Sequence, residues 1–105
     1  MTRMARIDDR FGAFADATRR RVLRVLCTSS DEASELPLDT LVTKVGESER
    51  LGNEDGQLRL HLVHVHLPKL ERAALVDYDG ETVRLTVETD VVTDGLRLAK
   101  RFETG

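Results

Sequence analysis

Apolar residues recur along most of the chain at the spacing of amphipathic helices. In the first half this spacing predicts three helices: one over residues 7–15, a second that starts after Asp16, and a third over residues 38–45. Asp16 and Thr18 are the candidates to cap the second helix, and Gly46 is the candidate to end the third. The residue before a proline avoids helical backbone, so Leu36-Pro37 is expected to form a short extended stretch between the second and third helices.

The segment from Gln57 to Ala74 carries two competing patterns. A helical stripe runs along its whole length, whereas residues 58–62 alternate between apolar and polar as a strand would. We favour a helix whose first residue the pattern does not define. Pro68 lacks a backbone N–H, so this helix is expected to kink near His64.

The third part of the pattern is a hairpin followed by a last helix. Two β-prone runs, residues 75–78 and 82–87, flank Asp79-Gly80, and glycine tolerates the positive φ of a tight turn. A final helix is expected from Val91 to about Phe102, capped by Thr89 or Asp90. Helices, a short extended piece and a hairpin in this order predict a winged helix-turn-helix, mainly α with a small β-hairpin wing. We expect one domain over residues 1–105, with a flexible N-terminus over 1–6 and a dimerisation helix over 90–103.

Two motifs in the chain are similar to a known family. Residues 11–26, FGAFADATRRRVLRVL, resemble the opening of ArsR/SmtB-type repressors, and residues 67–76, LPKLERAALV, resemble the end of that family's recognition helix. The phrase HVHLPKL at 64–70, followed by VDYD at 76–79, is closer still to a group of small haloarchaeal winged-helix domains without an assigned function. The resemblance spans Phe11 to about Val87 and implies a DNA-binding transcription regulator. The cysteine pair of the classical metal sensors is absent from the third helix, which excludes sensing through that site.

Composition limits the class of protein further. A hydrophobic share of 40% beside 33% charged residues is typical of a globular domain, and with no Trp and three Phe its core must be aliphatic. The net charge is −3, so a DNA-binding surface would depend on local clustering of cations. The sequence shows neither a membrane-spanning apolar run nor a secretory signal, and Cys27 is the single cysteine. These features favour a cytoplasmic protein.

The helix expected over residues 57–74 corresponds to the recognition helix of the family that the chain resembles, and it carries most of the candidate DNA-binding residues. They are Arg59, His61, His64, His66, Lys69 and Arg72, with Arg84 added from the wing. The alternative for each of them is a solvated helix face. The denser basic run of Arg19, Arg20, Arg21 and Arg24 is interpreted first as structural. The wing is acidic, with Asp77, Asp79 and Glu81, which keeps open a second function: a protein-interaction module that binds no DNA.

Metal binding and catalysis find little support in the sequence. The spacing of His61, His64 and His66 is poor for tetrahedral coordination and no cysteine joins them, so neither a metal nor another cofactor is expected. A sensor that uses these histidines or Cys27 is the weakest alternative. We find no catalytic constellation and expect no enzyme.

The last helix is expected to pair two copies of the chain. Val92, Leu96 and Ala99 can pack on the domain's own core, which leaves an apolar strip of Val91, Gly95, Leu98 and Phe102. A homodimer would cover this strip, with Gly95 letting the two backbones approach. The alternative is a monomer whose last helix folds back on its own domain. The expected partners are therefore double-stranded DNA and a second copy of the chain, with no membrane; the sequence points to no effector ligand.

Overall fold

The computed structural model describes residues 7–28, 34–49 and 55–103. In chain order its elements are α1 (Ile7–Phe14), α2 (Ala17–Thr28), β1 (Glu35–Pro37), α3 (Leu38–Glu49), α4 (Asp55–His61), the π-helical turn η1 (Leu62–His66), α5 (Leu67–Arg72), β2 (Val76–Tyr78), β3 (Thr82–Leu85) and α6 (Thr89–Glu103). This is the order that the sequence predicts. The expected flexible N-terminus, residues 1–6, lies outside the described residues.

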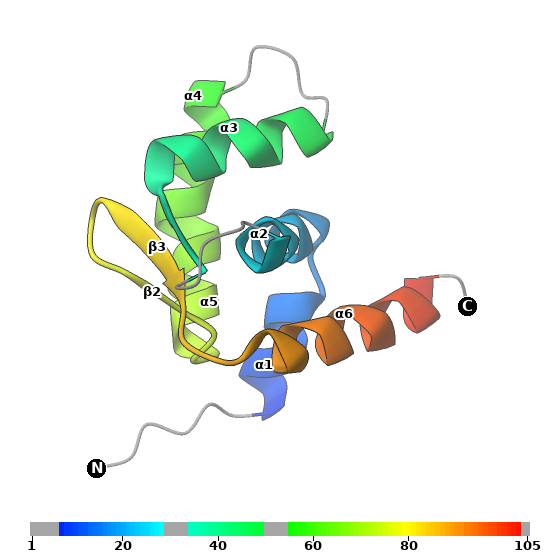
Figure 1. Cartoon of the computed structure of the whole chain (residues 1–105). Coiled ribbons are helices and arrows are strands. Elements are labelled where there is room, and N and C mark those ends of the chain that lie inside the picture. The colour runs from blue at the N-terminus through cyan, green and yellow to red at the C-terminus, as the bar shows by residue number, and fades with distance from the viewer. Residues whose placement is uncertain (1–6, 29–33, 50–54, 104–105) are drawn as a thin grey trace.

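Helix α2 lies at the centre of the molecule (Figure 1). It contacts α1, α3, α6 and β3, and its Val22, Leu23 and Leu26 are fully buried. Around it the core is aliphatic, as the composition predicts. The other large side chains that are fully buried are Leu41, Val45, Leu62, Leu67, Leu70, Leu75, Val76, Val83 and Val92.

The sheet has three antiparallel strands in the order β1-β3-β2. Leu36 of β1 is opposite Val83 of β3, and Val76 of β2 is opposite Leu85 of β3, so four buried apolar residues share the inner face. The extended stretch expected at Leu36-Pro37 is thus confirmed as β1. Immediately after it, the N–H of Leu38 donates to the carbonyl of Glu81 at 2.8 Å, which ties the start of α3 to the hairpin.

The hairpin turn is the one that Asp79-Gly80 predicts. Gly80 has a φ of 100°, and Asp79 Oδ1 accepts the N–H groups of Glu81 at 2.9 Å and Thr82 at 2.8 Å. These two hydrogen bonds lower the pKa of the Asp79 carboxyl. The second strand ends at Leu85, two residues earlier than the pattern suggests.

Segments α4, η1 and α5 form one long helix over residues 55–72, and the strand alternative for residues 58–62 is wrong. The irregularity expected near His64 is present as η1, in which the N–H of Leu67 donates to the carbonyl of Leu62, five residues back. Pro68 has no N–H to offer the carbonyl of His64, so the regular ladder is interrupted at this point. We refer to residues 55–72 as the long helix.

Helices α3 and α6 extend beyond their expected bounds. Helix α3 continues through Gly46 to Glu49, and Gly80 is the glycine with positive φ in the described part of the chain. A glycine inside a helix costs about 1 kcal/mol relative to alanine, which the packing of α3 on α2 can offset. Helix α6 begins at Thr89, with Asp90 in its first turn, and ends at Glu103.

The long helix ends in a left-handed residue that is not glycine. Ala74 has a φ of 60°, its N–H donates to the carbonyl of Glu71 at 2.9 Å, and the N–H of Leu75 donates to the carbonyl of Leu70 at 3.0 Å. This pair of bonds is the Schellman motif, in which the left-handed position usually holds glycine. The chain therefore carries local strain where the long helix turns into β2.

Replacing Ala74 with glycine is expected to raise the free energy of unfolding by about 0.5–1 kcal/mol, because glycine reaches this φ without the Cβ penalty. Urea unfolding measures the change. The matched control is Ala99→Gly inside α6, which is expected to lower stability by about 1 kcal/mol. A wild-type or lower stability for Ala74→Gly would contradict the left-handed conformation at this position.

Candidate nucleic-acid interface

One face of the long helix is exposed and carries no acidic side chain over residues 56–72. Its exposed side chains are Gln57, Arg59, Leu60, His61, His64, Val65, Lys69 and Arg72. The opposite face is buried through Leu58, Leu62, Leu67 and Leu70. Glu71 is the one acidic residue in this range, and its Oε2 accepts the N–H of Tyr78 at 3.2 Å. Five of the seven candidate DNA-binding residues lie on this exposed face: Arg59, His61, His64, Lys69 and Arg72.

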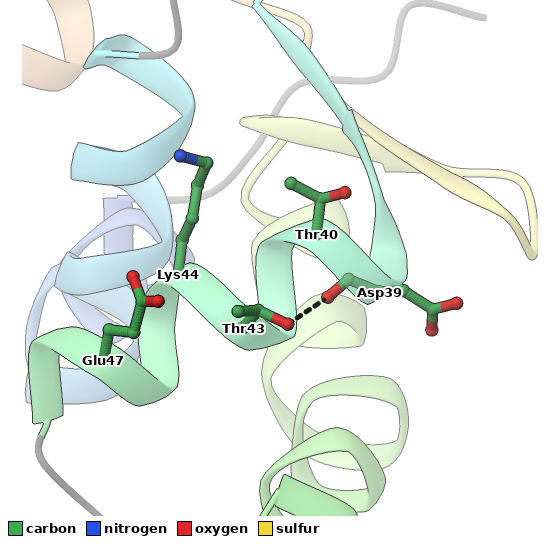
Figure 2. A pocket seen from close by; sticks show the side chains of 5 residues that line it. All are labelled: Asp39, Thr40, Thr43, Lys44 and Glu47. Atoms are coloured by element: carbon green, nitrogen blue, oxygen red, sulfur yellow. Dashed lines mark hydrogen bonds between the residues drawn. The ribbon is translucent and has the colours of Figure 1, made fainter.

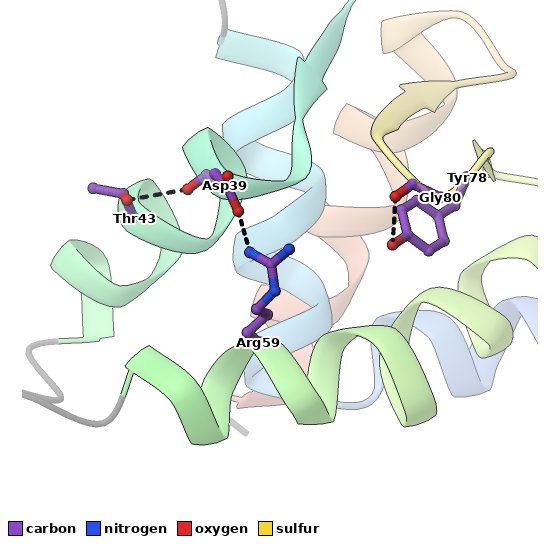
Figure 3. A network of polar contacts seen from close by, with 5 residues as sticks. All are labelled: Asp39, Thr43, Arg59, Tyr78 and Gly80. Atoms are coloured by element: carbon purple, nitrogen blue, oxygen red, sulfur yellow. Dashed lines mark hydrogen bonds and ion pairs between the residues drawn. The ribbon is translucent and has the colours of Figure 1, made fainter.

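Arg59 is paired with an acidic residue of α3. Its Nη1 donates to Asp39 Oδ1, a contact drawn in Figure 3, and the Asp39 carboxylate raises the pKa of Arg59. Both side chains are at least half exposed, and ion pairs between exposed side chains are weak. The guanidinium therefore remains available to an incoming phosphate. Periodicity could not predict this pair, since the two residues are 20 positions apart.

His66 does not share the exposed face, which corrects its assignment to the DNA-binding set. The residue is half-buried, and Nη1 of Arg19 lies 3.1 Å from its Nδ1. A guanidinium can only donate, so Nδ1 of His66 accepts and the ring proton is on Nε2. His66 is the last residue of η1, and its contact with Arg19 joins the long helix to α2.

Two arginines of the basic run in α2, Arg19 and Arg20, are buried and make structural hydrogen bonds, as expected. Arg19 donates to the carbonyl of Gly12 through Nε at 3.1 Å and Nη2 at 2.9 Å, and Arg20 donates to the carbonyl of Phe14 at 2.7 Å. Both carbonyls belong to the last turn of α1, where donors within the helix run out. The carbonyl of Gly12 also accepts the N–H of Ala15 at 3.2 Å, and Arg19 adds charged donors to it. Arg10 does the same for the end of α5, donating to the carbonyl of Ala73 at 2.9 Å.

Asp16 caps α2, as one of the two sequence candidates predicts. Its Oδ1 accepts the N–H of Thr18 at 2.8 Å and the N–H of Arg19 at 3.2 Å. Partial burial raises the pKa of this carboxyl, but the two hydrogen bonds and the charge interactions with His66 and Arg19 outweigh the effect of burial. The net effect is a lowered pKa.

The wing is acidic in the structure as in the sequence. Arg84 of β3 is opposite Asp77 of β2, and its Nη2 lies 3.4 Å from Asp77 Oδ2. Asp79 and Glu81 at the tip are exposed. Arg84 therefore belongs to a cross-strand pair on a surface with excess negative charge.

Helices α1 and α6 contact each other and leave large apolar side chains exposed. Phe11 of α1 is 58% exposed, and Leu98 and Val91 of α6 are 45% and 38% exposed. Gly95, by contrast, is covered within the chain, because a Cβ at this position would lie 2.2 Å from Cζ of Phe14. The close approach expected of Gly95 between two copies is thus made to α1 of the same chain. The Phe102 side chain lies outside the described residues.

A surface hollow on α3 is lined by Asp39, Thr40, Thr43, Lys44 and Glu47 (Figure 2). All five residues belong to one helix, so the hollow is the outer surface of α3 and not a cleft between elements. In the described ranges no three His, Cys, Asp or Glu side chains are grouped to hold a metal ion. Cys27 is half-buried against the core, and burial raises the pKa of its thiol.

Together, α3, the long helix and the β2–β3 hairpin define the class of the fold. Helix α3 is followed by the long helix and then by the β2–β3 hairpin, so the domain is mainly α with a small β wing, the winged helix-turn-helix arrangement that the sequence predicts. The chain belongs to the family described as domain of unknown function (DUF7344), which matches residues 11–86. Searches of curated proteins and of solved structures gave no match. None of the described helices is long and apolar enough to cross a membrane.

Proposed function

We propose that this protein is a DNA-binding transcription regulator that inserts the long helix into the major groove of duplex DNA. The observation that carries the proposal is the charge of that helix. The chain has a net charge of −3, yet the exposed side chains of residues 56–72 include three cations and two histidines and no carboxylate. This face is thus suited to bind a polyanion such as DNA.

The proposal is tested by measuring the affinity of the full chain for duplex DNA at several salt concentrations. If Arg59, Lys69 and Arg72 each neutralise one phosphate, the log–log slope is about −2.7 per protomer. Lys69→Ala is expected to weaken binding to every sequence and to reduce the slope by about 0.9. The matched control is Arg97→Ala, which removes one cation from the exposed side of α6 and is expected to leave the slope unchanged. A folded chain that binds no duplex at low salt would refute the proposal.

A second candidate function is a protein-interaction module that binds no DNA. It is favoured by the acidic wing, where Asp77, Asp79 and Glu81 face solvent in a place that would approach phosphates in many winged-helix complexes. It is also favoured by the exposure of Leu60 and Val65 on the long helix. The same salt titration distinguishes this candidate, which predicts no binding to duplex DNA.

We further propose that the active form is a homodimer paired through α1 and α6. Phe11, Val91 and Leu98 supply the apolar surface, and such exposed side chains on contacting helices are typical of an interface. Two-fold pairing would present two recognition helices to successive major grooves, about 34–36 Å apart.

Leu98→Glu and Phe11→Glu are each expected to shift the chain from dimer to monomer in sedimentation equilibrium, because a carboxylate would be buried against the second copy. Leu60→Glu is the matched control, since it places the same charge on an exposed leucine of the long helix and should leave the dimer intact. A wild-type chain that remains monomeric at high micromolar concentration would contradict the dimer.

A further inference from the structure

Two apolar side chains interrupt the exposed face of the long helix. Leu60 is 55% exposed and Val65 is 38% exposed, and the exposed residues His61 and His64 lie between them in the sequence. Leu60 and His64 are four residues apart, as are His61 and Val65, and all four side chains are exposed on this helix. We refer to these four residues as the Leu60–Val65 patch.

The charges around this patch restrict its occupant. Arg59, whose guanidinium also contacts Asp39, directly precedes the patch, and Lys69 and Arg72 follow it. The carboxylate of Glu71 accepts the N–H of Tyr78. A complementary surface is therefore negative at both edges and apolar at its centre. The major groove of an A·T-containing duplex has this character, because phosphates line both edges and the thymine 5-methyl group projects from the floor.

We infer that the Leu60–Val65 patch contacts thymine methyl groups in the major groove, so that the preferred duplex contains A·T pairs opposite Leu60 and Val65. The inference rests on the proposed DNA-binding function and adds a source of sequence preference to it. Cations at the edges bind phosphates of any sequence, whereas an apolar contact with a methyl group distinguishes thymine from the other bases. Removing one such methyl from water corresponds to about a fourfold gain in affinity.

The test begins with selection of duplexes from a random pool by the full chain at low salt. In the selected duplex each thymine is then replaced in turn by deoxyuridine, which deletes the 5-methyl group and keeps the Watson–Crick pairing. Replacement at the positions opposite the patch is expected to weaken binding about fourfold for each methyl. Replacement elsewhere in the same duplex is expected to have no effect.

Protein variants assign the effect to the patch. Leu60→Ala, and independently Val65→Ala, should lower the affinity for the thymine duplex. At one position each variant should also bring the ratio of the affinity for the thymine duplex to the affinity for the uracil duplex close to one. Lys69→Ala should lower affinity for both duplexes and keep the ratio, because a phosphate contact does not sense the methyl group. Thermal unfolding checks that each variant is folded.

The outcomes separate the inference from the function on which it rests. The inference is supported if the wild-type chain prefers the thymine duplex over the uracil duplex and if Leu60→Ala or Val65→Ala removes that preference. Salt-dependent duplex binding with no response to uracil at any position overturns the inference and leaves the proposed function in place. Absence of any duplex binding overturns both the inference and the proposed function.

Discussion

Gly95→Ala is expected to lower the free energy of unfolding by up to about 2 kcal/mol. Inserting a methyl group into a filled site costs about 1–3 kcal/mol, and the better helix propensity of alanine offsets about 1 kcal/mol of that cost. The new Cβ would lie 2.2 Å from Cζ and 2.6 Å from both Cε atoms of Phe14, so the ring has to leave its position between α1 and α6. Urea unfolding of the purified chain measures the loss. The expected effect is large because Gly95 is where the backbone of α6 meets a ring of α1.

Two further variants show whether the loss comes from this contact. Phe14→Leu removes the far end of the ring, so the double variant with Gly95→Ala should recover part of the loss in a double-mutant cycle. Gly12→Ala in α1 is the control, because a Cβ there meets nothing within 4 Å. Alanine has a better helix propensity than glycine, so Gly12→Ala should raise the free energy of unfolding by about 0.5–1 kcal/mol. A Gly95→Ala chain as stable as the wild type would mean that α6 does not pack on α1 in this way.

Arg19→Ala is expected to lower the free energy of unfolding by about 2–3 kcal/mol, because it removes a buried side chain together with its charged hydrogen bonds. The Arg19 side chain makes two hydrogen bonds to the carbonyl of Gly12 and a third contact with Nδ1 of His66. The substitution therefore removes one tie between α1 and α2 and one between α2 and the long helix. Thermal or urea unfolding measures the loss.

The control for Arg19→Ala is Arg24→Ala, which removes an exposed arginine from the same helix and should change stability by less than about 0.5 kcal/mol. NMR of the His66 ring supplies a second readout. Its signals should move in Arg19→Ala and stay in place in Arg24→Ala. Equal losses in the two variants would show that the Arg19 contacts contribute nothing specific.

Much of this fold could be predicted because its signals are local. The Asp79-Gly80 turn, the extended pair Leu36-Pro37 and the cap at Asp16 each depend on backbone chemistry within a few residues. Gly46 shows the limit of such signals, since the packing of α3 on α2 outweighed the tendency of one glycine to end a helix.

The candidate site was predicted in its residue types and less well in its pairings. Periodicity places His61, His64, Lys69 and Arg72 on one outer face, but it cannot show that Arg59 meets Asp39 or that His66 meets Arg19. Those contacts join residues 20 and 47 positions apart and depend on how the helices cross. The sequence indicates Gly95 as a point of close approach, but it does not show that the ring of Phe14 from the same chain lies there.

The π-helical turn has a consequence for insertions and deletions in the long helix. Along its buried side, Leu58 and Leu62 are four residues apart, and Leu62 and Leu67 are five apart, one more than an α-helix accommodates without rotating the next side chain outward. The turn absorbs this extra residue, so both halves of the helix keep their leucines in phase with the core. A deletion of one residue at Val63 or Val65 would restore regular α spacing between the leucines. The same domain could thus exist in two lengths that differ by one residue in this helix, with Lys69 and Arg72 on the same face in both forms.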